Sequence, residues 1–263
     1  MRWFDSAMPA RRRCSGGVRC LIIAFLWSAN VYAEPAWKNV ADGIQYKKVV
    51  VDKKVTTEKS FPPDLIHMLQ IDTLKYKLGV ITAKQFGMTN TDVKTMAGMA
   101  GALIVMNGGY FTPEYDSLGL LVQNGQVLNK LKWTNWWHVF QMNSYKPMIV
   151  TKQDWKLAKE IEMAIEAGPR LIVDGNIQGG LKPGIAERSA IGITTDGRVI
   201  IAATEGYQVS LSEFAQALRD NDCYNALNLD GGGSTQLYAK MKRFGLNRPG
   251  FSFIANGIGV FPR

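Results

Sequence analysis

One segment of the sequence joins a carboxylate to three consecutive glycines and a hydroxyl. After the mainly apolar residues 226–229 come, in order, Asp230, Gly231, Gly232, Gly233 and Ser234. Three glycines bring no side chain to a core and lose the most backbone freedom on folding, which favours a sharp turn or a close approach to a ligand. Backbone N–H groups in such a turn can bind an anion. We interpret the segment as an anion-binding turn; a tight turn without chemistry is the alternative.

Three further loops place polar residues next to apolar strands. They are Asn107-Gly108-Gly109-Tyr110-Phe111, Ala167-Gly168-Pro169-Arg170 and Glu187-Arg188-Ser189-Ala190. Guanidinium groups can hold a phosphate through two hydrogen bonds, and a carboxylate can activate water or attack directly. A carboxamide can hold sugar hydroxyls, and an aromatic ring can stack on a sugar face. These groups suit a phosphorylated sugar, although spacing alone does not establish that the loops converge.

The elements that must position these loops are mostly strands. Alternating apolar residues and turn dipeptides predict them. The expected strands lie within residues 65–71, 75–81, 102–106, 118–128, 139–150, 164–173, 190–203 and 257–261. Asn124-Gly125 and Asp196-Gly197 supply the turns of two hairpins. We read His67 as a half-buried strand histidine and not as a ligand.

Helices are fewer. One is expected from Thr91 or Asp92 to about residue 100, and an amphipathic one begins at Ser210 or Ser212. A brief helical stretch is expected from Asp154 to Lys159. We see no linker that would mark a second domain. The sequence therefore predicts one compact α+β domain over residues 34–263, with a mixed β-sheet core and a few helices.

The first 33 residues have the pattern of a secretory signal peptide. Basic residues, including Arg11 and Arg19, precede an apolar run from Leu21 to Trp27, and small residues lie at the expected cleavage point. We expect cleavage after Ala33, a secreted or periplasmic protein, and no stable membrane insertion afterwards. An uncleaved anchor is the alternative.

The composition, 46% hydrophobic and 20% charged, is that of an ordinary globular protein. Removing residues 1–33 takes away five Arg and one Asp and lowers the formal charge from +9 to +5. This weak basicity suits an anionic substrate or an envelope surface. It also leaves Cys223 as the only cysteine, which we expect to be a small buried hydrophobic residue and not a nucleophile.

The sequence carries no strong signal for a cofactor. His67 and His138 are the only histidines and there is no paired His or Cys spacing, which argues against zinc. Asp230 with Asn228 or Glu205 could hold a divalent cation through oxygen ligands, so a divalent-cation site stays an alternative. No lysine follows the glycines as in nucleotide-binding loops, so we do not expect a bound nucleotide. We also expect no nucleic acid as partner.

Three blocks make the sequence resemble the phosphodiester glycosidase family. They are Asn107-Gly-Gly-Tyr-Phe, Arg188-Ser-Ala-Ile-Gly-Ile and Asn228-Leu-Asp-Gly-Gly-Gly-Ser, in that order, and the similarity covers roughly residues 65–261. The resemblance implies a hydrolase of sugar-1-phosphodiesters with a compact α/β fold around one cleft. Ser189 stands where animal members have a threonine, which keeps the hydroxyl. The cysteine-rich and membrane-spanning extensions of those members are missing, so their targeting does not carry over.

The resemblance also implies roles for the site residues. Asp230 would be the catalytic base or nucleophile, and Arg188 would neutralise the phosphodiester and the charge on the leaving group. Asn107 and Ser189, with Gly108, would orient the substrate. The residues Gly231, Gly232, Gly233 and Ser234 would form an oxyanion-binding turn.

The remaining candidates are less constrained. For a second carboxylate we rank Glu205 above Glu187 and Asp174, and we expect the last two to be solvated turn residues. Arg170 could bind phosphate or be an exposed strand arginine. In the cluster Trp133, Trp136, Trp137 and His138, we expect Trp137 to pack in the core. For Trp133 and Trp136 two alternatives remain: they pack in the core, or they form an exposed edge of the cleft on which sugars stack.

The sequence thus favours an exported hydrolase of sugar-1-phosphodiester linkages, resembling N-acetylglucosamine-1-phosphodiesters, in envelope or extracellular glycans. No cofactor is assigned. One alternative is a non-catalytic envelope protein that binds an anionic glycan. Another is a metal-dependent phosphodiesterase that cleaves the P–O bond.

Overall fold

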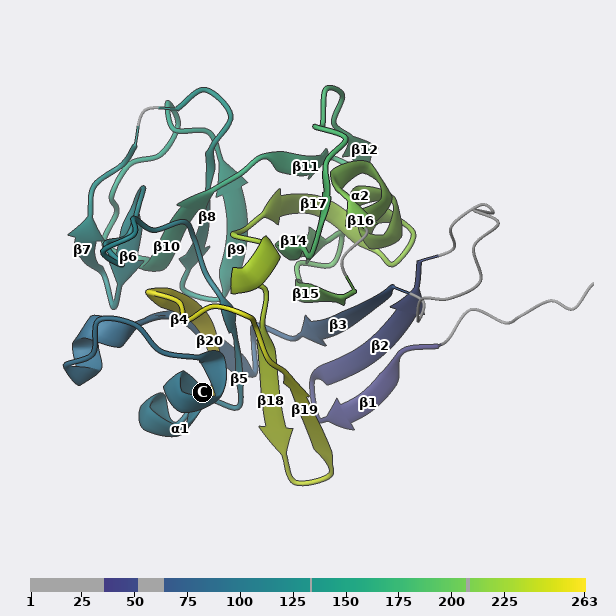
Figure 1. Cartoon of the computed structure of the whole chain (residues 1–263), viewed down its shortest axis with the longest axis horizontal. Coiled ribbons are helices and arrows are strands. Elements are labelled where there is room, and N and C mark those ends of the chain that lie inside the picture. Colours follow the sequence, from purple (N-terminus) through teal and green to yellow (C-terminus); the bar gives the residue numbers. More distant parts are fainter. Residues whose placement is uncertain (1–35, 52–63, 133, 207–208) are drawn as a thin grey trace, which may run out of the picture. The chain divides into compact units, whose positions relative to one another are not determined.

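The computed structural model describes residues 36–51, 64–132, 134–206 and 209–263. Residues 34–263 form one compact unit, and the strands dominate it (Figure 1). The expected signal peptide, residues 1–33, lies outside the described residues, as does Trp133. No helix in the described ranges is long and apolar enough to cross a membrane.

Three large sheets make up the fold. The eight-stranded sheet has the order β1-β2-β3-β15-β14-β17-β11-β12, and two five-stranded sheets have the orders β7-β6-β10-β8-β9 and β19-β18-β5-β20-β4. A short fourth sheet pairs β13 with β16. The strands are β1 (Lys38–Ala41), β2 (Ile44–Val50), β3 (Leu65–Ile71), β4 (Tyr76–Thr82), β5 (Ile104–Asn107), β6 (Leu121–Gln123), β7 (Gln126–Asn129), β8 (His138–Asn143), β9 (Lys146–Val150), β10 (Ile161–Ala167), β11 (Arg170–Val173), β12 (Asn176–Ile177), β13 (Ile185–Ala186), β14 (Ser189–Thr194), β15 (Val199–Glu205), β16 (Val209–Ser210), β17 (Cys223–Asn228), β18 (Leu237–Met241), β19 (Phe244–Arg248) and β20 (Asn256–Pro262).

One central core lies between the three large sheets. In β15, Val199 and Ile201 point into this core, whereas Ile200 and Ala202 point to the opposite face. Successive side chains of a strand face opposite sides of the sheet. Both faces of β15 are therefore covered, which explains its unbroken apolar run.

The two α-helices cover outer faces of the sheets. The helix α1 (Val93–Ala100) is capped by Asp92, whose carboxylate accepts the Thr95 N–H at 2.9 Å. The helix α2 (Leu211–Arg219) begins at Ser210 with a capping box, and its apolar face packs on the eight-stranded sheet (Figure 1). Both N-caps confirm the sequence prediction. Two short 3-10 helices, η1 (Ala83–Phe86) and η2 (Gly232–Ser234), complete the described elements.

Several expectations need correction. The fold is predominantly β, because the two α-helices are only eight and nine residues long. The expectation of a mixed β-sheet is also wrong, because all pairings among the described strands are antiparallel. Residues 154–159 form turns and irregular backbone, not a helix. The strands expected within residues 139–150 were placed on either side of Lys146-Pro147, but the turn lies at Ser144, which adopts φ of 54°, and Pro147 belongs to β9.

Cys223 is a core residue, as expected. Its side chain is buried at the start of β17, and burial raises the pKa of the thiol to about 12. A chain carrying Cys14→Ser and Cys20→Ser should therefore not react with Ellman's reagent at about pH 8 while folded, since the thiolate is the reacting form. Full reaction is expected in guanidinium chloride. Rapid reaction of the folded chain would contradict this burial.

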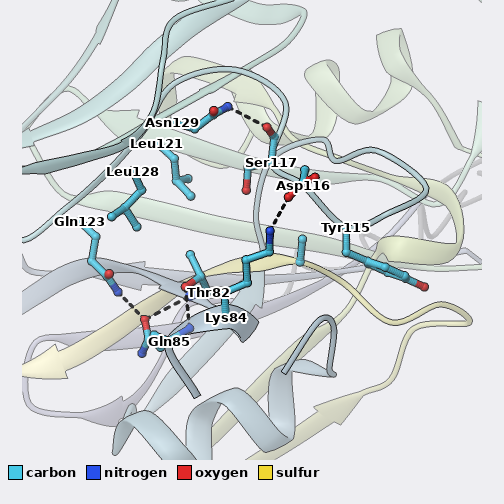
Figure 2. Close-up of a pocket in the computed structure, with 11 residues that line it drawn as sticks. Thr82, Lys84, Gln85, Tyr115, Asp116, Ser117, Leu121, Gln123, Leu128 and Asn129 are labelled. Carbon is cyan, nitrogen blue, oxygen red and sulfur yellow. Dashed lines mark hydrogen bonds and ion pairs between the residues drawn. The ribbon is translucent and has the colours of Figure 1, made fainter. Parts of the chain in front are cut away.

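A cavity in the described part of the chain lies away from the glycine turn. It has a volume of about 420 Å³ and lies beside β4, η1, β6 and β7 (Figure 2). Its other wall is the segment that follows the Asn107-Gly108-Gly109 loop.

Candidate functional site

Asn107 brings three of the sequence blocks together. Its Nδ2 donates to the backbone oxygen of Asp230 at 2.7 Å, and its Oδ1 accepts the Ser189 hydroxyl at 2.7 Å. The same oxygen accepts the Gln236 N–H at 3.1 Å. Asn107 and Ser189 have no exposed surface. They were expected to orient the substrate, but this geometry makes them residues that position the Asp230 turn.

Gly108, Gly231 and Gly233 sit where a larger residue would collide with its neighbours, and Gly232 adopts a backbone conformation that favours glycine. A Cβ at Gly108 would lie 2.2 Å from Asn256 Oδ1, and one at Gly231 would lie 2.8 Å from the Glu187 carbonyl oxygen. Gly232 adopts φ of 59°, and a Cβ at Gly233 would lie 2.7 Å from Ser252 Oγ. The glycines therefore allow the turn to pack closely against its neighbours.

The N–H groups of this turn are largely engaged within the protein. The Gly231 N–H donates to Asp230 Oδ1 at 2.9 Å, and the Gly232 N–H donates to the Glu187 carbonyl at 2.8 Å. The Ser234 N–H donates to the Gly231 carbonyl at 3.2 Å. Of these three N–H groups, one contacts the Asp230 carboxylate and two contact backbone carbonyls. An oxyanion-binding role of the turn stays a prediction.

The Asp230 carboxyl group is held in an environment that favours proton transfer. Burial raises its pKa, and hydrogen bonds from the Ser234 hydroxyl and the Gly231 N–H act in the opposite direction. Desolvation disfavours the charged form of a carboxyl group, whereas donated hydrogen bonds stabilise it. A raised carboxyl pKa suits general acid–base work near neutral pH.

Arg188 immediately precedes β14, and two backbone carbonyls hold its side chain. Its Nε donates to the Val209 carbonyl at 3.1 Å, and a terminal nitrogen donates to the Gly184 carbonyl. Burial lowers the pKa of its guanidinium. The two backbone contacts fix the orientation of Arg188 and leave further N–H groups for a ligand.

Tyr110 connects Asp230 and Arg188 electrostatically. Burial raises the pKa of Tyr110 to about 12, with Asp230 raising it further and Arg188 lowering it. The Tyr110 hydroxyl donates to the Gly168 carbonyl at 2.5 Å. The backbone contacts around Arg188 agree with this: the Gly232 N–H donates to the Glu187 carbonyl at 2.8 Å, and the Leu229 N–H donates to the Ser189 carbonyl at 2.9 Å. Asp230 and Arg188 therefore lie in one neighbourhood, and their joint catalytic role stays a prediction.

An exposed aromatic ring borders this neighbourhood. Trp137 is buried and stacks on Tyr110 with ring centres 4.9 Å apart. Trp136 keeps 51% of its surface exposed and meets Tyr110 edge to face at 6.4 Å. The structure thus confirms core packing for Trp137 and places Trp136 where a ligand beside Tyr110 could stack on it.

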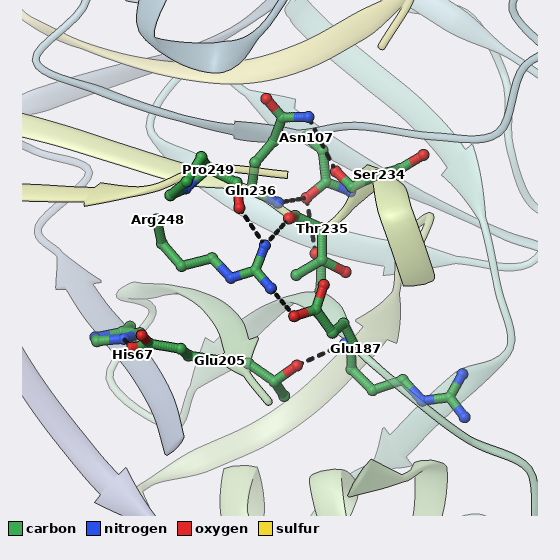
Figure 3. A network of polar contacts seen from close by, with 12 residues as sticks. His67, Asn107, Glu187, Glu205, Ser234, Thr235, Gln236, Arg248 and Pro249 are labelled. Carbon is green, nitrogen blue, oxygen red and sulfur yellow. Dashed lines mark hydrogen bonds and ion pairs between the residues drawn. The ribbon is translucent and has the colours of Figure 1, made fainter. Parts of the chain in front are cut away.

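A buried ion pair lies beneath the glycine turn. Arg248 pairs with Glu187 Oε1, and its other terminal nitrogen donates to the Thr235 carbonyl and, at 2.7 Å, to the Pro249 carbonyl (Figure 3). The two side chains are only 5% and 2% exposed. Glu187 is therefore not the solvated turn residue that its sequence context indicated. Together with the Gly232 contact to the Glu187 backbone, this pair joins β19, the turn and the start of β14.

The second predicted carboxylate lies in a different setting. Glu205 Oε2 contacts His67 Nε2 at 2.8 Å, and His67 Nδ1 contacts the Tyr46 hydroxyl at 2.8 Å. The Glu205 side chain is 56% exposed. No described contact joins it to Asp230 or Arg188, so a catalytic role for Glu205 remains a prediction. Asp174 is an exposed turn residue, as expected.

Arg170 faces another part of the fold. Its guanidinium donates to Asn225 Oδ1, and burial lowers its pKa while Asp174 raises it. None of its described contacts involves the Asp230 turn. A role as a second phosphate ligand therefore has no support in the geometry.

Glu166 was missed by sequence reasoning. It is fully buried in β10, where its Oε2 accepts the Leu120 N–H at 2.8 Å and the Lys132 N–H at 2.7 Å. Burial raises its pKa. Its hydrogen bond to the Lys132 N–H holds the segment that leads to Trp136 and Trp137. A glutamate within the apolar strand Ile161–Ala167 was the available signal.

No metal site can be assigned from the described residues. Nowhere in them do three His, Cys, Asp or Glu side chains gather so as to hold a metal ion.

Comparison with known proteins finds a matching family model and a relative. A family model described as phosphodiester glycosidase matches residues 100–261. The uncharacterized protein YigE of Escherichia coli K12 is 30% identical over 138 residues, which are 48% of this chain and 51% of that protein. The chain therefore spans about half the length of this relative.

Three solved structures share the fold. The catalytic domain of zebrafish N-acetylglucosamine-1-phosphodiester alpha-N-acetylglucosaminidase, auto-inhibited by its pro-peptide, has a TM-score of 0.67 at 17% identity, with 87% of each chain covered. A hypothetical protein from Synechocystis has 0.59 at 18% identity, covering 87% of this chain and 64% of that one. A protein from Burkholderia pseudomallei K96243 has a TM-score of 0.51 at 12% identity, covering 76% of this chain and 74% of that one.

Proposed function

Because this chain belongs to the phosphodiester glycosidase family, we propose that it hydrolyses sugar-1-phosphodiester linkages in a glycan. The observation that carries the proposal is the packing of the Asp230 turn against the residues that flank Arg188: the Gly232 N–H donates to the Glu187 carbonyl at 2.8 Å, and the Leu229 N–H donates to the Ser189 carbonyl at 2.9 Å. A carboxylate can activate water, and a nearby guanidinium can neutralise the charge of a phosphodiester.

The proposed reaction breaks the bond between the sugar C1 and the phosphodiester oxygen. Water supplies the hydroxyl that appears on C1, and a phosphate monoester leaves. Arg188 would compensate the charge of the leaving phosphate through its uncommitted N–H groups. Asp230 would act as base or nucleophile, and the Ser234 hydroxyl would hold its carboxylate in place.

The direct test uses the purified protein and an α-N-acetylglucosaminyl phosphodiester in oxygen-18 water. We expect the label in the released sugar and unchanged turnover with a chelator. Label in the phosphate would show P–O cleavage instead. Tight binding without product would support a non-catalytic glycan-binding protein and contradict the proposal.

Trp136 supplies a prediction about substrate binding. Trp136→Ala is expected to raise KM several-fold with a smaller change in kcat, because an aromatic contact contributes about 0.5–1.5 kcal/mol. Steady-state kinetics on the same phosphodiester measure this. The matched control is Trp155→Ala, since Trp155 packs against a different cluster. Equal KM for wild type and Trp136→Ala would remove the stacking role.

We also propose that the protein acts outside the cytoplasm. The basic and apolar pattern of residues 1–33 supports this location. Cell fractionation and N-terminal sequencing test it: a mature chain beginning at residue 34 is expected. An intact N-terminus in the cytoplasm would contradict it.

A further inference from the structure

The large cavity has the size and position of a ligand site separate from Asp230. Its volume of about 420 Å³ falls in the range of small-molecule sites. It lies where the edge strand β4 of one sheet approaches β6 and the edge strand β7 of another. The segment from Tyr115 to Ser117 closes its far side (Figure 2).

Amide side chains line the cavity in fixed orientations. Asn129 Nδ2 donates to the carbonyls of Ser117 and Gly119, both at 2.7 Å. Gln123 Nε2 donates to the Val80 carbonyl at 3.0 Å and to Gln85 Oε1. These bonds use the N–H groups, and neither Asn129 Oδ1 nor Gln123 Oε1 accepts a hydrogen bond from another described residue. Two oriented acceptors are therefore left for a ligand.

The lining has no unpaired charge. Among the described lining residues, Lys84 and Asp116 alone are charged, and their side chains form an ion pair across the cavity (Figure 2). An anion would have to break this pair to obtain a cation. Leu121 and Leu128 supply apolar surface beside the amides. Polar acceptors next to apolar surface, without net charge, suit a neutral hydroxylated ring.

The wall of the cavity is ordered by its own hydrogen bonds. The Thr112 N–H donates to the Asp116 carbonyl at 2.8 Å, and the Tyr115 N–H donates to the Thr112 carbonyl at 2.9 Å. Tyr115 adopts φ of 63°, a region that non-glycine residues rarely occupy. A wall formed before the ligand arrives lowers the entropy cost of binding.

From these observations we propose that the cavity is a second, non-catalytic site that binds a neutral saccharide. The amide oxygens of Gln123 and Asn129 would accept sugar hydroxyls, and Leu121 and Leu128 would contact the apolar face of the ring. This site does not depend on hydrolysis at Asp230.

The test is an NMR titration of the isotope-labelled full chain carrying Asp230→Asn, which separates binding from turnover. The probes are N,N′-diacetylchitobiose and inorganic phosphate. We expect the disaccharide to shift the backbone amide signals of Gln123, Asn129 and Ser117 saturably, and phosphate to leave them unchanged. Gln85→Ala, which removes an exposed wall residue, should weaken binding about tenfold, or about 1.4 kcal/mol. Gln216→Ala on α2 is the matched control and should bind as the parent does.

Three results would overturn the proposal. They are no shift in the cavity at saturating disaccharide, shifts confined to Trp136 and its neighbours, and displacement of the sugar by phosphate. Equal binding by Gln85→Ala and Gln216→Ala would also count against it. Absence of hydrolytic activity in the wild type would contradict the proposed function alone.

Discussion

Replacing Asp230 with Asn is expected to lower kcat for glycosyl phosphodiester hydrolysis by about 10²–10⁴-fold, the usual contribution of general acid–base catalysis. Asparagine keeps the size of the side chain and one oxygen that can accept the Gly231 N–H. The fold should therefore persist while the proton-transfer group is lost. KM should change much less than kcat.

The matched control for this prediction is Asp174→Asn. Asp174 is an exposed turn residue with φ of 47°, a conformation that asparagine tolerates well. It should retain wild-type kcat and KM. If Asp230→Asn and Asp174→Asn turn over substrate equally fast, Asp230 is not the catalytic carboxylate.

The pH dependence of the wild type follows from the same carboxyl group. Burial raises the pKa of Asp230, and a base or nucleophile acts in its ionised form. Activity should therefore fall as the pH drops through this raised pKa, above the range of an ordinary aspartate. A profile of kcat against pH measures the midpoint. Activity that persists into the acidic range would mean that Asp230 works in its protonated form.

The second large effect concerns stability. Arg248→Met is expected to lower the free energy of unfolding by about 3–5 kcal/mol, because it leaves the Glu187 carboxylate buried without its partner. Adding Glu187→Gln should recover much of this loss, since the buried charge then disappears. Denaturant unfolding followed by tryptophan fluorescence gives the three free energies.

The stability deficit of Arg248→Met should depend on pH. Burial raises the pKa of Glu187, and Arg248 opposes that rise. Without Arg248 the carboxyl should take up a proton more readily in the folded than in the unfolded chain, so acidification should favour folding of the variant. The deficit of Arg248→Met should shrink as the pH falls from neutral toward the acidic range. Arg219→Met, at an exposed arginine of α2, should stay within about 0.5 kcal/mol of wild type. A pH-independent deficit would show that Glu187 is not the cause.

Local signals predicted much of the fold correctly. The hairpin around Asp196-Gly197 and the helix beginning after Ser210 were found because a turn dipeptide and a capping box act within a few residues. The predominance of β-structure over α+β, and the uniformly antiparallel pairing, depend on contacts between distant strands. Residue types do not encode these contacts locally.

In the candidate site, too, local motifs were predictable and contacts between distant residues were not. Asn107 ends β5, Ser189 begins β14 and Asp230 follows the end of β17 by two residues, and their motifs marked these positions. The three residues meet at one junction. Glu187 was misjudged because its partner Arg248 lies on β19, far along the chain. A charged residue looks solvated until its counter-ion is known. Arg170, in contrast, has a suitable residue type but faces Asn225.

The contacts of Asn107 have a consequence for folding kinetics. They join it to residues 82 and 123 positions away, and thereby tie β5 to the segments around β14 and β17. Closing such long loops is slow, and non-local β topologies fold more slowly than local ones. During refolding, secondary structure should therefore return before the contacts of Asn107, because these contacts form only after the sheets have docked.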